Sequence, residues 1–382
     1  MDKKSKLLAG IYLHVPFCTK KCAYCDFYSL ANPKLKNDFV QALLQEIELQ
    51  KHYLDQERIQ TIYFGGGTPS LLSIEQLDKI LDALHHHFRI EKNIELTLEA
   101  NPENLTNAYL SALNRLGFNR LSIGIQSLAR NDLELMRRTH TPQTALEAVD
   151  LAKNKGFKNI SVDLIYGLPQ QGIKEWENNL NRIIDMDIQH LSAYHLTIEP
   201  GTLFKKWYDQ HKIQLPDEKK SLEQYRLLVE KTAAHGFLHY EISNFAKDGF
   251  LSLHNTNYWM GVKYLGLGPS AHSFDLTSRQ WNISNLGVYL YEISKGNVPK
   301  EKEVLTLKEK FNEYIITSFR TMWGVDIKKV ELNFEGSMYN NFLKKIQKYK
   351  KDGFVTQNHH QFKLSEKGVM ISDHILADLF YD

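Results

Sequence analysis

All three cysteines of the chain lie in one short run, Cys18-Thr19-Lys20-Lys21-Cys22-Ala23-Tyr24-Cys25. The spacing is C-x3-C-x2-C, and no other position in the sequence carries a thiol. An odd number of cysteines confined to one loop speaks against a framework of disulfides. The run therefore predicts a single metal site on Cys18, Cys22 and Cys25.

Three thiolates fit an iron–sulfur cluster better than a zinc ion. A cubane [4Fe–4S] cluster has four iron corners, and protein thiolates usually hold all of them. With three thiolates, one iron must take another ligand or stay open to a small molecule. The alternative is a Cys3His zinc site completed by His14 or another of the 16 histidines. Compact triples are less typical of zinc, so the spacing favours the cluster.

Working outward, length and charge limit the class of protein. The chain has 382 residues, which suggests two or three domains, or a barrel of ~250 residues with a smaller module. Lys and Arg number 47 against 45 Asp and Glu, a near balance that argues against a nucleic-acid-coating protein. Since no run is long enough to span a bilayer and residues 1–10 lack a signal peptide's apolar segment, we expect a cytoplasmic protein.

Apolar and β-branched runs alternate with amphipathic segments over about 190 residues. The predicted strands are Ile11–Val15, Thr61–Phe64, Ile94–Glu99, Arg120–Ile125, Ile160–Leu164 and His190–Leu196. The predicted helices between them include Lys36–Tyr53, Ser73–His87, Thr106–Leu116 and Thr144–Lys155. This alternation indicates parallel strands with helical crossovers, and six units suit a partial barrel. An open doubly wound sheet is the alternative.

Polar residues follow each predicted strand at its carboxyl end, which favours the barrel. They are the cysteine run, Gly65–Ser70, Glu99–Pro102, Gln126-Ser127, Asp163 with Tyr166–Pro169, and Tyr194-His195. In α/β barrels the chemistry is assembled at this end from several strands at once. We therefore predict one large site there.

The pattern changes after residue 200. A helix is predicted at Leu222–His235, and loops at His254–Trp259 and Gly266–Ser270. A second module from near Lys300 contains predicted helices at Leu307–Met322 and Tyr339–Lys351, a hairpin at Phe354–Leu364 and a helix after Ser365. This order is typical of a winged-helix-like domain. The lysines of 344–351 could form a DNA-binding face, but interleaved apolar residues favour an amphipathic helix with a solvated basic side.

From the pattern alone we expect three parts: a core over 1–245, a connecting segment over 246–300 and a C-terminal domain over 301–382.

The motifs then point to a family. Cys18–Cys25 resembles the signature of radical S-adenosylmethionine (SAM) proteins, and Gly65–Pro69 resembles their GGGTP loop. Tyr12–Phe17 and Asp163–Pro169 are similar to the branch that contains the oxygen-independent coproporphyrinogen III oxidase.

This resemblance, over roughly residues 10–275, implies a partial (β/α)6 radical SAM barrel carrying a [4Fe–4S] cluster with SAM on its open iron. The family's SAM contacts fall on Tyr12, Tyr24, Gly66, Gly67, Thr68, Glu99, Gln126, Arg138, Asp163 and Thr197. Glycines allow close backbone approach, and an arginine suits a carboxylate. As purely structural alternatives, Glu99 would cap the turn at Asn101-Pro102, and Arg138 would be a surface residue.

Two departures separate the chain from the oxidase. The oxidase has a further cysteine two positions after the third, where this sequence has Phe27, and its longer N-terminal segment is expected to be absent, since 17 residues precede Cys18. In contrast, His254-Asn255-Thr256-Asn257-Tyr258-Trp259 resembles the H-N-x-x-Y-W motif of HemW-type haem chaperones.

The HemW resemblance implies haem as cargo, with His254 as its ligand, since histidine is a standard haem-iron ligand. It also implies haem-accepting proteins, some of them membrane-associated, and an electron donor as partners, no nucleic acid, and leaves a homodimer open. Whether the chain is also an enzyme stays open. The alternatives for the protein are a radical SAM oxidative decarboxylase acting on a porphyrinogen and a zinc-stabilised binding protein. The alternative for His254 is a structural histidine packed by Trp259.

Overall fold

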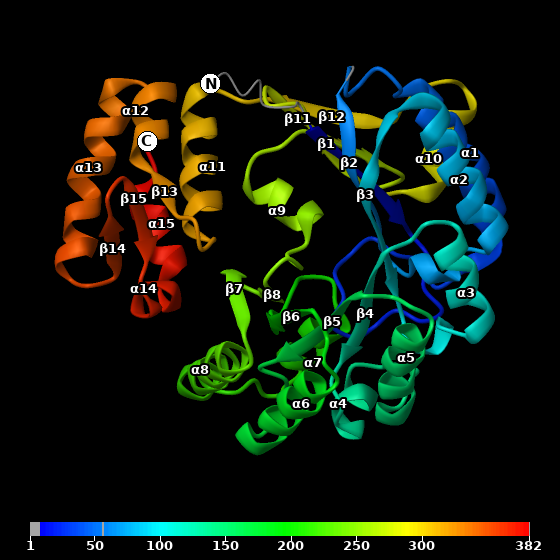
Figure 1. Cartoon of the computed structure of the whole chain (residues 1–382), viewed down its shortest axis with the longest axis horizontal. Coiled ribbons are helices and arrows are strands. Elements are labelled where there is room, and N and C mark those ends of the chain that lie inside the picture. Colours follow the sequence, from blue (N-terminus) through cyan, green and yellow to red (C-terminus); the bar gives the residue numbers. More distant parts are fainter. Residues whose placement is uncertain (1–7, 56, 382) are drawn as a thin grey trace.

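The computed structural model describes residues 8–55 and 57–381; residues 1–7, where the sequence predicts no signal peptide, lie outside the described part. Figure 1 shows a large unit built on a curved sheet and a smaller C-terminal unit beside it. The large unit holds a 12-stranded sheet, and the small unit holds a three-stranded sheet.

Six parallel strands in chain order form the centre of the large sheet. They are β1 (Leu8–Val15), β2 (Arg58–Gly66), β3 (Arg89–Ala100), β4 (Arg120–Gln126), β5 (Asn159–Tyr166) and β6 (His190–His195). The connecting helices are α1 (Lys36–Leu49), α2 (Ile74–His87), α3 (Asn107–Arg115), α4 (Arg130–Leu135), α5 (Pro142–Asn154) and α6 (Ile173–Asp185). The strand order never reverses between β1 and β6, so the partial barrel is confirmed and the doubly wound alternative is wrong.

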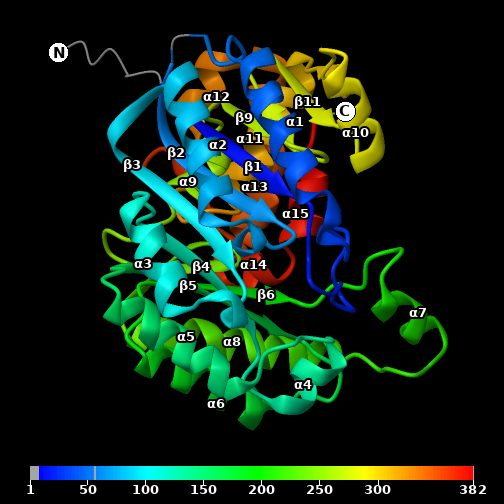
Figure 2. The same ribbon diagram turned by 90° about the vertical axis from the view of Figure 1, so that its right-hand side faces the viewer.

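Alternation along each strand separates an apolar outer face from a polar interior. On β1, Ile11 and Leu13 are fully buried in the main apolar core, whereas Tyr12 and His14 take part in interior contacts. The helices cover the outer face, as Figure 2 shows for α5 and α6. The interior therefore holds polar side chains that are buried yet available for a site.

The segment 246–300, expected as a connection, belongs to the main sheet and its core. It contains α9 (Leu253–Trp259), β9 (Tyr264–Leu267), β10 (His272–Phe274), β11 (Ser278–Asn282), α10 (Leu286–Ser294) and β12 (Lys300–Val304). Strand β9 pairs in parallel with β1, and β10, β11 and β12 continue the sheet antiparallel. The predicted loop at His254–Trp259 is wrong, because these residues form α9, and the predicted loop at Gly266–Ser270 begins inside β9.

The other edge of the sheet turns antiparallel after β6. Here lie α7 (Leu203–Asp209), α8 (Glu218–Ala234), β7 (Phe237–Glu241) and β8 (Asn244–Lys247), and β8 pairs with β6. Helix α8 covers the predicted Leu222–His235 and starts earlier, because the Asp217 side chain accepts a hydrogen bond from the Lys220 N–H and caps it.

The C-terminal unit has an apolar core of its own, which includes Phe311, Phe342 and Phe362. Its elements are α11 (Leu307–Phe319), β13 (Val325–Asp326), α12 (Ile327–Asn333), α13 (Gly336–Lys351), β14 (Val355–Asn358), β15 (Gln361–Leu364), α14 (Glu366–Met370) and α15 (Ser372–Leu379). The predicted hairpin is β14–β15. Because β12 still belongs to the large sheet, the C-terminal unit begins at α11, a few residues after the expected 301.

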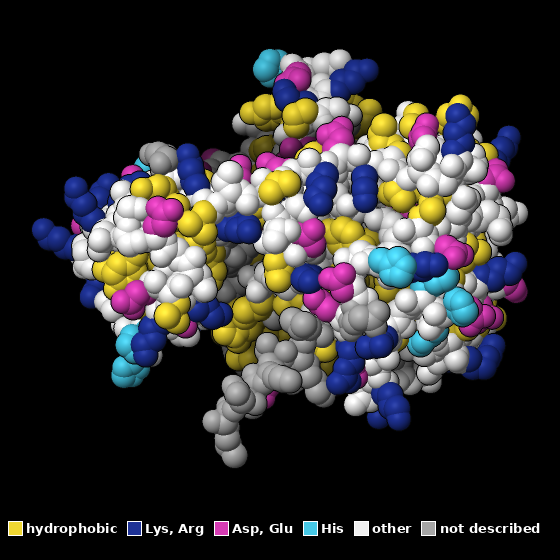
Figure 3. Space-filling view, turned by 90° about the horizontal axis from the view of Figure 1, so that it is seen from above, with side chains coloured by type: hydrophobic (Ala, Val, Ile, Leu, Met, Phe, Trp, Pro, Cys, Tyr) yellow, Lys and Arg dark blue, Asp and Glu magenta, His cyan; other side chains and the backbone are white. Residues whose placement is uncertain are grey.

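Helix α13 is amphipathic, as the favoured interpretation of its lysines predicts. Ile346 and Tyr349 are buried in the core while Lys344 and Lys348 are exposed. Seen from above, charged side chains of both signs are interspersed over the surface (Figure 3). Among the described residues, no helix has the length and apolar character needed to cross a membrane.

Candidate functional site

The cysteine loop leaves the carboxyl end of β1 and is held by backbone hydrogen bonds on several sides. The Cys18 N–H donates to the Leu30 carbonyl at 3.0 Å, and the Ala23 N–H donates to the Met136 carbonyl at 3.0 Å. The Ala23 carbonyl in turn accepts from the Phe204 N–H at 2.9 Å. Its three cysteines are free thiols, each partly exposed. The loop therefore presents three sulfurs from a fixed backbone.

Two polar side chains from other elements lie beside these sulfurs. The Thr68 hydroxyl is 3.5 Å from the Cys18 sulfur, and Arg138 Nη1 is 3.5 Å from the Cys22 sulfur. Burial raises the pKa of the Cys25 thiol to about 11, and the neighbouring thiols of Cys22 and Cys18 add to this shift. Donors that stabilise thiolate sulfur thus come from the loop after β2 and from the turn after α4.

The loop fits a multi-iron cluster by its donor set. Each thiolate of a cubane cluster binds a different iron, so the sulfurs do not need to converge on one point. Within the described ranges, no three His, Cys, Asp or Glu side chains are grouped to hold a single metal ion. His14, the zinc alternative's fourth ligand, points its Nε2 at the Tyr28 carbonyl, 2.8 Å away. Three thiolates are the donor set that a cluster with one open iron would need.

The glycine loop brings β2 against the start of the cysteine loop. Gly66 has φ of +104°, a conformation that favours glycine. A Cβ atom on Gly67 would lie 2.6 Å from the Phe17 carbonyl oxygen, so no side chain fits there. These glycines therefore allow two backbone segments to approach each other at the end of the barrel.

Two carboxylates stand inside the barrel next to this loop. Glu99 accepts hydrogen bonds from the Tyr63 hydroxyl at 2.8 Å and from the Gly66 N–H at 3.2 Å. Burial raises its pKa to about 7. Asp163 accepts from the Ser122 hydroxyl at 3.2 Å, and burial raises its pKa as well. Glu99 thus binds the glycine loop, and the interpretation of Glu99 as a cap of the Asn101-Pro102 turn is wrong.

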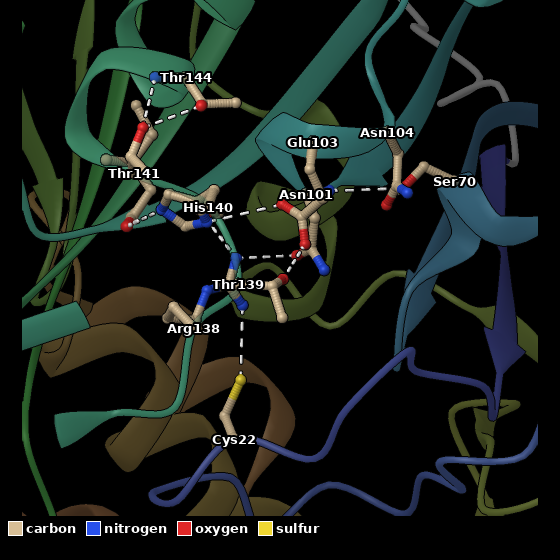
Figure 4. Close-up of polar contacts among 12 residues, drawn as sticks. Cys22, Ser70, Asn101, Glu103, Asn104, Arg138, Thr139, His140, Thr141 and Thr144 are labelled. Atoms are coloured by element: carbon tan, nitrogen blue, oxygen red, sulfur yellow. Dashed lines mark hydrogen bonds and ion pairs between the residues drawn. The ribbon is translucent and has the colours of Figure 1, made fainter. Parts of the chain in front are cut away.

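Arg138 is partly buried and links β4 and the residue after β3 to the cysteine loop (Figure 4). Its Nη2 donates to the Asn101 side-chain oxygen at 2.8 Å and to the Gly124 carbonyl at 2.5 Å. Its Nε is buried with no hydrogen-bond partner. The surface interpretation of Arg138 is therefore wrong, and one of its donors is left free within the site.

A network that the sequence did not predict positions Arg138. Glu103 accepts from the Thr139 hydroxyl and lies 3.6 Å from His140 Nδ1, while His140 Nε2 donates to the Ile125 carbonyl at 3.1 Å. Burial opposes ionisation of Glu103, but the nearby His140 ring and the hydrogen bond from Thr139 outweigh it and lower the pKa of Glu103 to about 2. The only sequence signal was the position of Asn101 and Glu103 directly after a strand.

Four further residues were expected to contact SAM: Tyr12, Tyr24, Gln126 and Thr197. Tyr12 stands inside the barrel with its ring 6.1 Å from that of Tyr63, and Tyr24 packs edge-on against Phe204 at 6.4 Å. Gln126 ends β4 with φ of +69° and is half-buried. Thr197 follows β6 and is exposed, so the structure does not draw it into the network.

His254 lies away from the cysteine loop and is 2% exposed. Its Nδ1 is 2.8 Å from the Thr61 hydroxyl, and its Nε2 is 2.8 Å from the Tyr258 hydroxyl. The ring stacks on Tyr63 at 5.0 Å, so its packing partners are tyrosines rather than Trp259. Burial lowers the pKa of His254 to about 3, with the charge of Arg120 adding to the effect. Both ring nitrogens are engaged, so neither is free to bind iron in this conformation.

Comparison with known proteins agrees with this arrangement. The sequence model of the Radical SAM superfamily matches residues 12–183, and that of the HemN C-terminal domain matches residues 305–371. The solved structure of coproporphyrinogen III oxidase (HemN) from Escherichia coli superposes with a TM-score of 0.83 at 22% identity, covering 97% of this chain and 90% of that one. Fold and cysteine loop define a radical SAM protein with a HemN-like architecture.

Curated relatives narrow the class further. The heme chaperone HemW of Bacillus subtilis is 32% identical over 374 residues, covering 97% of this chain and 98% of that protein. The heme chaperone HemW of Escherichia coli is 37% identical over 265 residues, 69% of each chain. The chain belongs to the HemW family.

Proposed function

We propose that this protein is a cytoplasmic haem chaperone that binds haem and passes it to haem-dependent acceptor proteins. The observation that carries the proposal is the full-length similarity to proteins named heme chaperone HemW. We further propose a [4Fe–4S] cluster on Cys18, Cys22 and Cys25. Its partners would be an electron donor for the cluster and haem acceptors, some of them at membranes.

Bound SAM would supply the ligands of the open iron and, on reduction, a source of radical chemistry. The chain's own residues would hold it. The Gly66–Thr68 backbone offers a close approach, and Glu99 offers an acceptor for an ammonium group. The free Nε of Arg138 suits a carboxylate, and Asp163 suits ribose hydroxyls. Tyr12, Tyr24, Gln126 and Thr197 would complete the pocket's outer contacts.

The test is an anaerobic haem titration of the purified protein, with and without an intact cluster. We expect about one haem per chain, the usual stoichiometry of a single axial site. A parallel assay supplies coproporphyrinogen III, reductant and SAM. Formation of protoporphyrinogen IX would replace the chaperone by the alternative, an oxidative decarboxylase, for which the HemN-like fold provides the specific support.

A further inference from the structure

A cavity of about 540 Å³ lies between the large unit and the C-terminal unit, well away from the cysteine loop. Its walls come from α8 and β7 on one side and from the end of α11, β15 and α14 on the other. Figure 1 shows α14 facing α8 and β7 across this junction. Ligand pockets of roughly 300–1,000 Å³ favour such domain interfaces.

The walls of the cavity are mainly apolar and aromatic. They include Tyr225, Val229, Ile242, Phe319, Leu364 and Val369. Phe319 is buried, and the other five are half-buried, so they leave surface for a ligand. Walls of this kind suit a flat apolar molecule that gains affinity by leaving water.

Cations from both units stand at the rim. Arg226 on α8 and Lys367 on α14 are exposed, and Arg320 and Lys363 line the cavity from the C-terminal unit. The carboxylates here are Glu230, Glu241 and Glu366, of which Glu241 is held by the Asn244 amide and the Ser243 N–H. The rim therefore offers cationic donors for an anionic group on the edge of an apolar ligand.

His239 supplies a metal ligand to the same cavity. Its Nε2 lies 3.2 Å from the Ile242 carbonyl, which only accepts, so Nε2 carries the proton and Nδ1 keeps a lone pair. Its ring stacks on Phe245 with centroids 4.3 Å apart, which fixes its plane. Histidines that bind a metal usually donate their other ring N–H to an acceptor such as a backbone carbonyl, and His239 meets this condition.

We propose that this cavity is the site where haem cargo is held. The macrocycle lies against the apolar walls, the iron binds His239 Nδ1, and the propionates meet Arg226 and Lys367. This inference rests on the proposed function and names its cargo site, in place of His254. Two backbone hydrogen bonds join the units here, from the Ile242 N–H to the Arg320 carbonyl at 3.2 Å and from the Met322 N–H to the Tyr240 carbonyl at 2.9 Å.

The test titrates ferric haem into the full-length, cluster-loaded protein and records the Soret band and the affinity. His239→Gln keeps an N–H donor for the Ile242 carbonyl but removes the imidazole nitrogen that would bind the haem iron. The Soret band should therefore shift. The double variant Arg226→Glu, Lys367→Glu should weaken haem binding at least tenfold, while binding of haem dimethyl ester changes less than threefold. Lys344→Glu, an exposed change on α13, is the matched control and should bind haem as the parent does.

The outcomes separate the two proposals. A parent protein that binds no haem overturns the proposed function. A parent protein that binds haem, with both cavity variants unchanged in spectrum and affinity, overturns the cavity and leaves haem binding intact. A Soret shift in His254→Gln but not in His239→Gln places the iron in the barrel and overturns the cavity as well. Iron and sulfide content, measured for each variant, shows that the barrel has folded.

Discussion

The two halves of the barrel interior are both polar, but their key side chains differ in exposure. At the carboxyl ends of the strands, the thiols are partly exposed and Arg138 Nε has no partner. In the amino half, α9 lies across β1 and β2, and His254 has a partner at each ring nitrogen. Figure 1 places α9 in the middle of the curved sheet. The thiols at the carboxyl end are thus accessible, whereas His254 in the amino half is enclosed by its partners.

Arg120 lies in the amino half of the barrel. It is 1% exposed at the start of β4, and its Nε and Nη1 have no hydrogen-bond partner. Its strand neighbours in register are Thr97 and Asn159, which also carry unpartnered polar atoms. Buried groups of this kind are commonly satisfied by ordered water. The amino half therefore also contains buried polar atoms that have no partner among the described residues, and the two halves differ in exposure instead.

The largest expected effect lies at the carboxyl end. Cys22→Ala should abolish stable cluster binding, because the sequence has no spare cysteine to replace the lost thiolate. Iron and sulfide analysis after anaerobic reconstitution measures it, with about four of each expected in the parent protein. Phe27→Ala changes a side chain of the same loop that is 63% exposed and should retain the cluster. Stoichiometric zinc in the parent protein would contradict the assignment.

An intermediate effect is expected in the amino half. His254→Ala leaves the hydroxyls of Thr61 and Tyr258 buried without this partner, at about 1–3 kcal/mol for each. We expect the free energy of unfolding to fall by about 4 kcal/mol, with iron content unchanged. Denaturant titration measures the loss, and His195→Ala, at an exposed position on β6, should cost little. A change below about 1 kcal/mol would show that the amino half does not depend on this histidine.

The contrast between the halves also shows what the sequence could predict. Strands β1–β6 were predicted to within a few residues, because their outer faces carry the apolar alternation that defines a strand. The three cysteines were predicted from their spacing, and the glycine loop from its place after a predicted strand and its resemblance to the GGGTP loop. Helix α9 was missed, and its start combines a local cap by Ser252 with a distant carboxylate, Glu95, which accepts from the Leu253 and His254 N–H groups. The Glu103–His140 network was missed because its members meet only in the folded chain.

The smallest expected effect concerns the charge of Glu99 at the carboxyl end of the barrel. It is measured as a dependence of stability on pH. Burial raises the pKa of Glu99 to about 7, whereas in the unfolded chain a glutamate titrates near 4.3. Between these two pKa values the folded state holds a proton on Glu99 that the unfolded chain has released. The stability that this proton contributes is fully present below about pH 4 and is lost as the pH rises through 7. Glu99→Gln stays neutral and cannot lose it.

We therefore expect the apoprotein of Glu99→Gln to gain stability relative to the parent protein as the pH is raised from 5 to 8, by on the order of 2 kcal/mol. Denaturant titrations at the two pH values measure this difference. Glu134→Gln, the same change at a side chain that is 63% exposed on α4, is the matched control. A parent protein and Glu99→Gln variant with parallel pH profiles would show that Glu99 is already ionised in the folded apoprotein. In that case Glu99 would be charged before any ligand binds. It could then accept an ammonium group without first releasing a proton.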